Sequence, residues 1–262
     1  MELGLKGRVA FITGASRGIG AAIAGALAAE GVDLALFGRD IERCAALAKE
    51  LQAQHSVRTA TVRLDFEQPA TIKSAVAEAI DALGRVDILV NNAGGATRGN
   101  LEELSDKAWD ACFAVKPIGL MRMTRETLSF LTRSDQGRII NIAGTRGREP
   151  SAVSVMSGPI NLGTLSATKV LANALGPKGI TVNAINPGST NTQRWDELIG
   201  MTAKRRNVSR EDAETYLVRE VPMGRVVKVE DIADLAVFLA SARAGMITGC
   251  AINVDGGRTR SI

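Results

Sequence analysis

The sequence predicts a single α/β domain built on a doubly wound, mostly parallel β-sheet. Three observations lead to this prediction. Short apolar segments with strand character alternate with helical patterns of roughly 10–15 residues along the chain. Only 3% of the residues are aromatic and 27 of 262 are glycine, so small side chains are available where helices approach a sheet. No linker or internal repeat interrupts the pattern, which favours one domain over two.

The strands are expected where short runs rich in Val, Ile, Leu and Phe precede a turn or a helix. In chain order they span residues 8–13, 32–37, 59–64, 86–90, 138–142, 179–186 and 251–254. The expected helices span residues 18–30, 41–54, 69–83 and 105–132, then a stretch ending at Gly176 and Pro177, and finally 231–242. Pro69 suits the start of a helix, and a Gly-Pro pair is a typical helix end. Strands joined through helices need crossover connections and therefore run parallel.

The polar segment 193–225 is the longest stretch in which no strand is expected. Long insertions of this kind in compact domains often cover a binding site. We therefore expect residues 193–225 to form a lid over the substrate.

Composition and charge restrict the class of protein. The 32 Lys and Arg residues exceed the 28 Asp and Glu residues by four, and the basic residues are scattered, which argues against a nucleic-acid partner. Three widely separated cysteines lack the spacing of metal ligands or of a disulfide framework, so no metal and a reducing compartment are expected. The chain has no signal-peptide layout and no apolar run near the ~18 residues that span a bilayer. A cytoplasmic protein without a membrane partner is expected.

A glycine-rich turn between the first strand and the first helix points to a bound dinucleotide. The turn reads Thr-Gly-Ala-Ser-Arg-Gly-Ile-Gly over residues 13–20. Glycines at such a turn let the backbone approach a pyrophosphate, and the helix N-terminus then aims free N–H groups at it. The residues expected to contact the cofactor here are Gly14, Ser16, Arg17, Gly18, Ile19 and Gly20. This is a Rossmann-like arrangement, although a tight turn without a ligand is the alternative.

The end of the second strand favours NADP(H) over NAD(H). Proteins that bind NAD usually place a carboxylate there, but this chain has Gly38 followed by Arg39. Together with Arg17, Arg39 would bring two guanidinium groups to the 2′-phosphate of the adenosine ribose. The alternative is that Arg39 is a solvated loop charge that pairs with Asp40.

Further motifs resemble those of the short-chain dehydrogenase/reductase family, and most closely its 3-oxoacyl-carrier-protein reductases. They are Asn-Asn-Ala-Gly at 91–94, Gly-Ile-Thr-Val-Asn at 179–183, Asn-Pro-Gly at 186–188 and Val-Asp-Gly-Gly at 254–257. The resemblance extends over about residues 6–257 and implies a homo-oligomer, a dimer or a tetramer. It also implies that Asp65 contacts the adenine. Asn91, Ala93 and Gly94 would line the adenosine side, and Pro187, Gly188 and Thr192 would hold the nicotinamide carboxamide. Alternatively, Asn91 ties two strands together, and Pro187 and Gly188 only form a turn.

The resemblance fails at the four catalytic positions of the family, which are an asparagine, a serine, a tyrosine and a lysine. Counting back without gaps from residues 179–183 places Ser157 at the tyrosine position and Asn161 at the lysine position. Gly144 falls at the serine position and Lys116 at the asparagine position. Lysine and asparagine have thus exchanged places, and the resemblance implies that their positions face each other across the pocket. Thr145 could supply a hydroxyl in place of the missing serine.

We expect an NADPH-dependent oxidoreductase with a non-standard active site around Lys116, Ser157, Asn161 and Thr145. A carbonyl or conjugated small molecule is the expected substrate. Arg98, Arg146 and Arg148 lie on loops that should border the cleft and fit an anionic substrate; the alternative is that they are solvated loop charges. Two alternatives remain open: a catalytically silent NADP(H)-binding regulatory protein, and a lyase or hydrolase that uses a lysine–serine pair. In the first of these, Lys116 neutralises a buried polar patch or holds the cofactor.

Overall fold

The computed structural model describes residues 2–261, apart from the side chain of Val153, and contains one seven-stranded parallel sheet. Its strands lie in the order β3-β2-β1-β4-β5-β6-β7. Their bounds are β1 Val9–Thr13, β2 Asp33–Gly38, β3 Thr59–Arg63, β4 Ile88–Asn91, β5 Arg138–Ile142, β6 Thr181–Pro187 and β7 Ala251–Val254. The predicted doubly wound α/β fold is confirmed.

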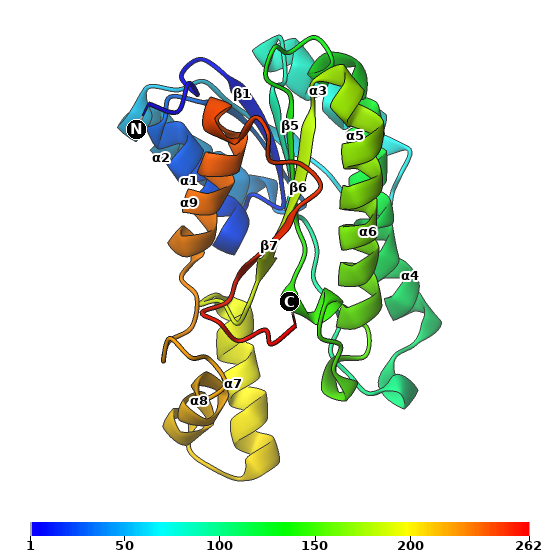
Figure 1. Cartoon of the computed structure of the whole chain (residues 1–262), viewed down its shortest axis with the longest axis vertical. Helices are drawn as coiled ribbons and strands as arrows, with labels where there is room; N and C mark the ends of the chain where they lie inside the picture. Colours follow the sequence, from blue (N-terminus) through cyan, green and yellow to red (C-terminus); the bar gives the residue numbers. More distant parts are fainter. Residues whose placement is uncertain (1, 262) are drawn as a thin grey trace.

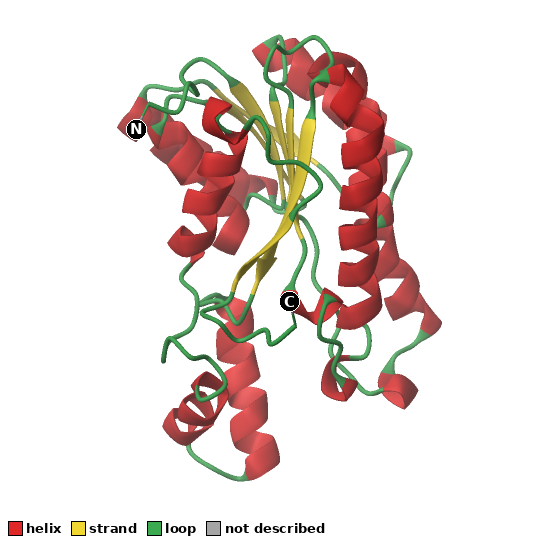
Figure 2. Cartoon of the chain, viewed as in Figure 1, coloured by secondary structure: helices red, strands yellow, loops and turns green. Residues whose placement is uncertain are grey.

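Helices cover both faces of the sheet (Figures 1 and 2). One face carries α1 Gly18–Ala29, α2 Ile41–His55 and α9 Val229–Ala240. The other carries α3 Thr71–Leu83, α4 Asp106–Val115, α5 Ile118–Leu131 and α6 Ser157–Leu175. Alternate side chains of β1 serve the two sides: Ala10 and Ile12 join the core with α1 and α9, whereas Val9 and Phe11 join the core with α3 and α5. Burial on both faces explains the nearly continuous apolar runs of the strands.

The expected single helix over 105–132 is wrong, because α4 and α5 are separate helices. Lys116 follows α4 in an extended conformation (φ −133°, ψ 131°), and Pro117 precedes α5. A proline disfavours the helical conformation in the residue before it and has no N–H to continue the helix. As a result, Lys116 leaves the helix and its side chain turns toward the end of the sheet.

The other boundaries differ from expectation by about two residues or less. The helix expected from residue 69 begins at Thr71, and the one expected from 231 begins at Val229, where Asp231 accepts a hydrogen bond from the backbone N–H of Lys228 at 2.8 Å. The strand expected from residue 179 begins at Thr181, because Gly179 has a left-handed conformation (φ 73°).

The segment 193–225 forms two helices, α7 Gln193–Arg206 and α8 Arg210–Val218, which project beyond the body of the sheet (Figure 1). They have a small apolar core of their own, centred on Trp195, Ile199 and Ala213. The segment follows the carboxyl end of β6. Its first turn contacts the loop after β1 through Arg17 and the loop after β4 through Ala96. Its role as a lid stays a prediction. Among residues 2–261, no helix combines the length and apolarity needed to cross a membrane.

Candidate functional site

The candidate site lies at the carboxyl ends of the central strands. The strand order places β1 beside β4, while β2 and β5 follow on opposite sides of this pair. In an open parallel sheet such a switch point leaves a crevice outside the strand ends, where ligands bind. The loops after β1, β4, β5 and β6 therefore supply the residues to consider.

The glycine-rich turn fits a dinucleotide pyrophosphate. A Cβ atom on Gly14 (φ 65°) would lie 2.8 Å from Ala93 Cα, and one on Gly20 would lie 2.3 Å from the carbonyl oxygen of Gly14. Only glycine therefore allows the turn, the loop after β4 and the start of α1 to approach each other so closely. Arg17, at the N-cap of α1, offers no side-chain cap, so the first N–H groups of this helix remain available to an anion.

Asn92, just after β4, fixes the glycine-rich turn of residues 13–20, which we call the glycine cradle. Its side-chain amide donates hydrogen bonds to the carbonyl oxygens of Thr13 and Gly14, each at 3.0 Å. The Thr13 hydroxyl accepts hydrogen bonds in return from the backbone N–H groups of Asn92 and Ala93. The ends of β1 and β4 are thus fixed relative to each other, which keeps the crevice in shape.

The two arginines expected at the ribose phosphate have separate partners in this structure. Arg17 donates to the side-chain oxygen of Gln193 at 2.5 Å, and the exposed Arg39 lies 4.0 Å from the carboxylate of Glu67. Asp40 instead caps α2 and pairs with Arg43, so the alternative pairing of Arg39 with Asp40 is not observed.

The remaining residues expected at the cofactor are distributed over the same edge. Asp65 accepts a hydrogen bond from the backbone N–H of Glu67 at 3.1 Å. Pro187 ends β6, and a Cβ atom on Gly188 would lie 2.8 Å from Asp255 Cβ. The methyl group of Thr192 lies beside Gly18, 3.6 Å from where its Cβ would be, so the loop after β6 reaches the glycine-rich turn.

Asn91 lies between the strands instead. Its side chain is 4% exposed and donates to Asn141 at 2.9 Å, which ties β4 to β5. This is the structural alternative considered from the sequence. A contact between Asn91 and an adenosine stays a prediction.

Lys116 is the central charged group of the candidate site. Its side chain is 7% exposed, and its ammonium group donates to the carbonyl oxygens of Ile142 at 2.5 Å and Ala143 at 3.4 Å, at the end of β5. Its aliphatic stem packs against Gly94, where a Cβ atom would lie 2.9 Å from the lysine carbons. An ammonium group has three N–H donors, so one remains for a ligand.

The environment of Lys116 favours its neutral form more than water does. Burial, and then the positive charge of Arg194, lower the pKa of Lys116 from 10.5 to about 8. A cation without a carboxylate partner is costly to bury, and a depressed pKa is the expected consequence. At pH 7 the group remains mostly protonated and can donate a proton.

Of the other expected catalytic residues, Asn161 and Thr145 lie at the same stretch of chain, whereas no hydrogen bond among residues 2–261 ties Ser157 to it. The Asn161 side chain lies against Gly144, where a Cβ atom would come within 3.1 Å of its amide nitrogen. The amide of Asn161 and the ammonium of Lys116 therefore meet at residues 142–144, from α6 and from the α4–α5 junction. Ser157 exchanges a 2.6 Å hydrogen bond with Ser154, and Thr145 is buried in the turn after β5. The one tyrosine of the chain, Tyr216, lies on α8, where the guanidinium group of Arg206 covers its ring.

A family model described as enoyl-(acyl carrier protein) reductase matches residues 14–259. The chain belongs to the short-chain dehydrogenase/reductase family. It is 32% identical over 256 residues to the NADPH-dependent reductase BacG of Bacillus subtilis, covering 97% of this chain and 99% of that protein. It is 33% identical over 258 residues to the 3-oxoacyl-[acyl-carrier-protein] reductase FabG of Aquifex aeolicus, covering 98% and 99% of the two. The crystal structure of L-sorbose reductase from Gluconobacter frateurii, complexed with NADPH and L-sorbose, matches with a TM-score of 0.95 at 30% identity and full coverage of both chains.

Within this short-chain dehydrogenase/reductase fold, Arg194 is a site residue that sequence reasoning missed. It lies in the first turn of α7 and donates to the carbonyl oxygen of Ala96 at 2.8 Å, with its guanidinium group against Gly95. Arg98 donates back to the Arg194 carbonyl at 3.1 Å, so the segment 193–225 and the loop after β4 are linked. In the sequence, the only indication that Arg194 lies at the site is that it follows Thr192, an expected cofactor residue, by two positions.

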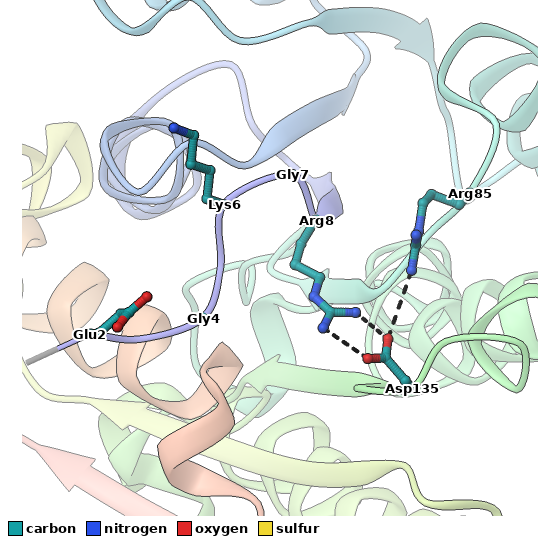
Figure 3. A pocket seen from close by; sticks show the side chains of 7 residues that line it. All are labelled: Glu2, Gly4, Lys6, Gly7, Arg8, Arg85 and Asp135. Atoms are coloured by element: carbon teal, nitrogen blue, oxygen red, sulfur yellow. Dashed lines mark hydrogen bonds and ion pairs between the residues drawn. The ribbon is translucent and has the colours of Figure 1, made fainter.

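A hollow of about 460 Å³ lies at the opposite, amino-terminal ends of the strands (Figure 3). Arg8, just before β1, pairs there with Asp135, just before β5, and Arg85 approaches the same carboxylate (Figure 3). In a parallel sheet this end is remote from the ligand crevice, so we do not place the function there. No cluster of three or more potential metal ligands occurs in the described part of the chain.

Proposed function

We propose that the protein is an NADP(H)-dependent oxidoreductase that reduces a carbonyl or a conjugated substrate, with Lys116 in place of the family tyrosine as proton donor. The observation that carries the proposal is the buried, protonated Lys116 beside Gly94, next to an intact glycine cradle. The NADPH-dependent reductase from Bacillus subtilis and the NADPH complex of L-sorbose reductase support NADP(H) as the cofactor. Arg17 and Arg39 would turn from Gln193 and Glu67 to its 2′-phosphate.

In this proposal, α1 and the loop after β6 bind the cofactor, and Lys116 donates the proton. The N-terminus of α1 binds the pyrophosphate, and the loop of Pro187, Gly188 and Thr192 orients the nicotinamide. When bound, NADPH supplies a hydride to the substrate carbon. Lys116 then delivers its proton to the substrate oxygen, which completes an alcohol and leaves a neutral amine that water reprotonates. The carbonyl oxygens of Ile142 and Ala143 hold the amine in place throughout.

The test is NADPH consumption with a panel of ketones, aldehydes and enones. Lys116→Ala should lower kcat by about 10²–10⁴-fold, the usual effect of removing a positioned acid. The wild-type kcat should fall as the pH rises above about 8, because Lys116 then loses the proton that it donates. Lys178→Ala, which changes an exposed lysine after α6, is the matched control and should behave as wild type.

Three outcomes would count against the proposal. Unchanged turnover in Lys116→Ala would remove Lys116 from the mechanism. Tight NADPH binding without turnover of any panel substrate would favour a regulatory NADP(H)-binding protein. Turnover that needs no NADPH would favour a lyase or hydrolase.

The same proposal includes a cytoplasmic homo-oligomer in which residues 193–225 close over the substrate. The family resemblance supports a dimer or a tetramer, and the three cysteines, all free thiols, suit a reducing compartment. Sedimentation at micromolar concentration would overturn the oligomer if it gave only the 27.6 kDa monomer.

A further inference from the structure

A second cavity, of about 310 Å³, adjoins the candidate catalytic residues from the side of the C-terminal tail. It is lined by the turn after β5, by the end of the α8 segment and by the tail. The lining residues are Thr145, Arg146, Glu149, Glu220, Arg258, Thr259 and Arg260. Figure 1 shows the tail leaving β7 and turning back to end near the chain that leads into α6. Thr145 comes two residues after Ala143, whose carbonyl oxygen holds Lys116, so the cavity and the proposed proton donor share one short stretch of chain.

The charges in this cavity do not balance. Three arginines face two glutamates, and both glutamates are already engaged. Glu220 pairs with Arg258. Glu149 accepts hydrogen bonds from the backbone N–H groups of Ser261 and Arg260, which hold the pKa of its carboxyl below the ordinary value. These bonds also fix the tail over the turn after β5.

Two of the three arginines, Arg146 and Arg260, have no ion pair among residues 2–261, and of these two only Arg146 is partly buried. Its half-buried guanidinium has no carboxylate within 4.0 Å among residues 2–261, and its only hydrogen bond goes to the carbonyl of Glu149 at 3.5 Å. Burial, together with the nearby Arg258, lowers the pKa of Arg146. The hydroxyl of Thr145 beside it makes no hydrogen bond within the part of the chain that is described. A partly desolvated guanidinium with free N–H groups is a site for a planar anion.

We propose that this cavity binds the carboxylate of the substrate, through the guanidinium of Arg146 and the hydroxyl of Thr145, so that the substrate class is an oxo acid. The single unbalanced positive charge matches a monoanion, as a carboxylate is at neutral pH. Consecutive Cα atoms are about 3.8 Å apart, so Thr145, which lines the cavity, lies within about 8 Å of Ala143, whose carbonyl oxygen accepts a hydrogen bond from Lys116. The inference rests on the proposed function, since both groups belong to one substrate.

The probe pair is 4-oxopentanoate and its methyl ester, which differ in charge but carry the same ketone. Calorimetry on the NADPH-loaded protein measures binding of each, and NADPH oxidation measures turnover of each. Wild type should bind the acid at least tenfold more tightly than the ester. Arg146→Gln should abolish this preference by weakening the acid about 10–100-fold, as expected for a lost charged hydrogen bond, and should leave the ester unchanged. Arg146→Lys should retain part of the preference, because lysine keeps the positive charge but cannot donate two parallel hydrogen bonds to the carboxylate.

Arg133→Gln is the matched control, since it removes an exposed arginine that only stacks on Phe130. It should keep the full preference for the acid. Equal binding of acid and ester in wild type, or a preference that survives in Arg146→Gln, would overturn the inference. Turnover of both probes without a preference would leave the proposed function standing without this subsite. A preference for the acid in binding, without turnover, would support the subsite and count against the proposed reductase.

Discussion

At the scale of single residues, the buried ammonium group of Lys116 should make the stability of the protein depend on pH. The folded-state pKa is about 8, whereas the unfolded chain keeps the ordinary 10.5. Between these values the unfolded state binds more protons at this position, so the free energy of unfolding rises with pH across this window. At about 1.4 kcal/mol per pKa unit, the contribution of Lys116 should grow by roughly 3 kcal/mol between pH 8 and 10.5.

Urea denaturation of wild type and Lys116→Met, at intervals from pH 7.5 to 10.5, would measure this contribution. The difference between the two proteins isolates Lys116 from the other groups that titrate in this range. Wild type should gain stability relative to the variant as the pH rises. Lys178→Met should run parallel to wild type. If the Lys116→Met curve is also parallel to wild type, the ammonium is not desolvated as described.

The candidate site could be predicted from the sequence only where a motif fixes the position of a residue. Lys116 and Asn161 could be placed by counting from a strand, and the structure brings both to residues 142–144. Arg194 and Arg258 could not be placed in this way. Their positions depend on the path of the segment 193–225 and of the C-terminal tail, which tertiary contacts between distant parts of the chain determine.

At the scale of elements, the contact between the turn after β5 and α6 depends on a glycine. A Cβ atom on Gly147 would lie 2.9 Å from the carbonyl carbon of Asn161 and 3.0 Å from the backbone nitrogen of Leu162. Backbone atoms of a helix cannot yield as a flexible side chain does. Gly147→Ala should therefore lower the free energy of unfolding by about 1–3 kcal/mol and should also reduce activity, because Thr145 and Asn161 would move apart.

Gly25→Ala is the matched control for this variant. Gly25 lies inside α1, and the nearest atom to its Cβ position is a Leu51 methyl carbon at 3.9 Å. Alanine should raise stability there by about 0.5–1 kcal/mol, because glycine loses more conformational entropy in a helix. Urea denaturation of both variants measures the difference, and a Gly147→Ala variant as stable as Gly25→Ala would refute the close contact.

Most elements followed from local sequence patterns. The exceptions are the break between α4 and α5, and the helices α7 and α8, which were not expected within residues 193–225. The runs at 138–142 and 251–254 coincide with β5 and β7. β5 is buried along its whole length, whereas β7 lies at the edge of the sheet and is partly buried. The periodic pattern over 105–132 did not reveal the break at Pro117, since the amphipathic pattern continues on both sides of it. A helical period reports which face is buried and says little about where the backbone bends.

At the scale of the whole molecule, binding of NADPH should stabilise the fold, because the cradle exists only when β1, β4 and α1 are assembled. A ligand at 100 times its Kd raises the free energy of unfolding by about 2.7 kcal/mol if it binds only the folded state. NADPH should raise the Tm more than NADH at equal concentration, because Arg17 and Arg39 provide charge for the 2′-phosphate.

Two glycines of the same helix provide the variants for this measurement. In Gly20→Ala the new Cβ would lie 2.3 Å from the Gly14 carbonyl oxygen, so the cradle cannot close and the Tm increase with NADPH should disappear. In Gly25→Ala the nearest atom is a Leu51 methyl carbon at 3.9 Å, so the full increase should remain. Thermal unfolding with and without each nucleotide gives the result directly. An increase that persists in Gly20→Ala would separate nucleotide binding from the cradle, and an equal increase with NADH would exclude the role given to the two arginines.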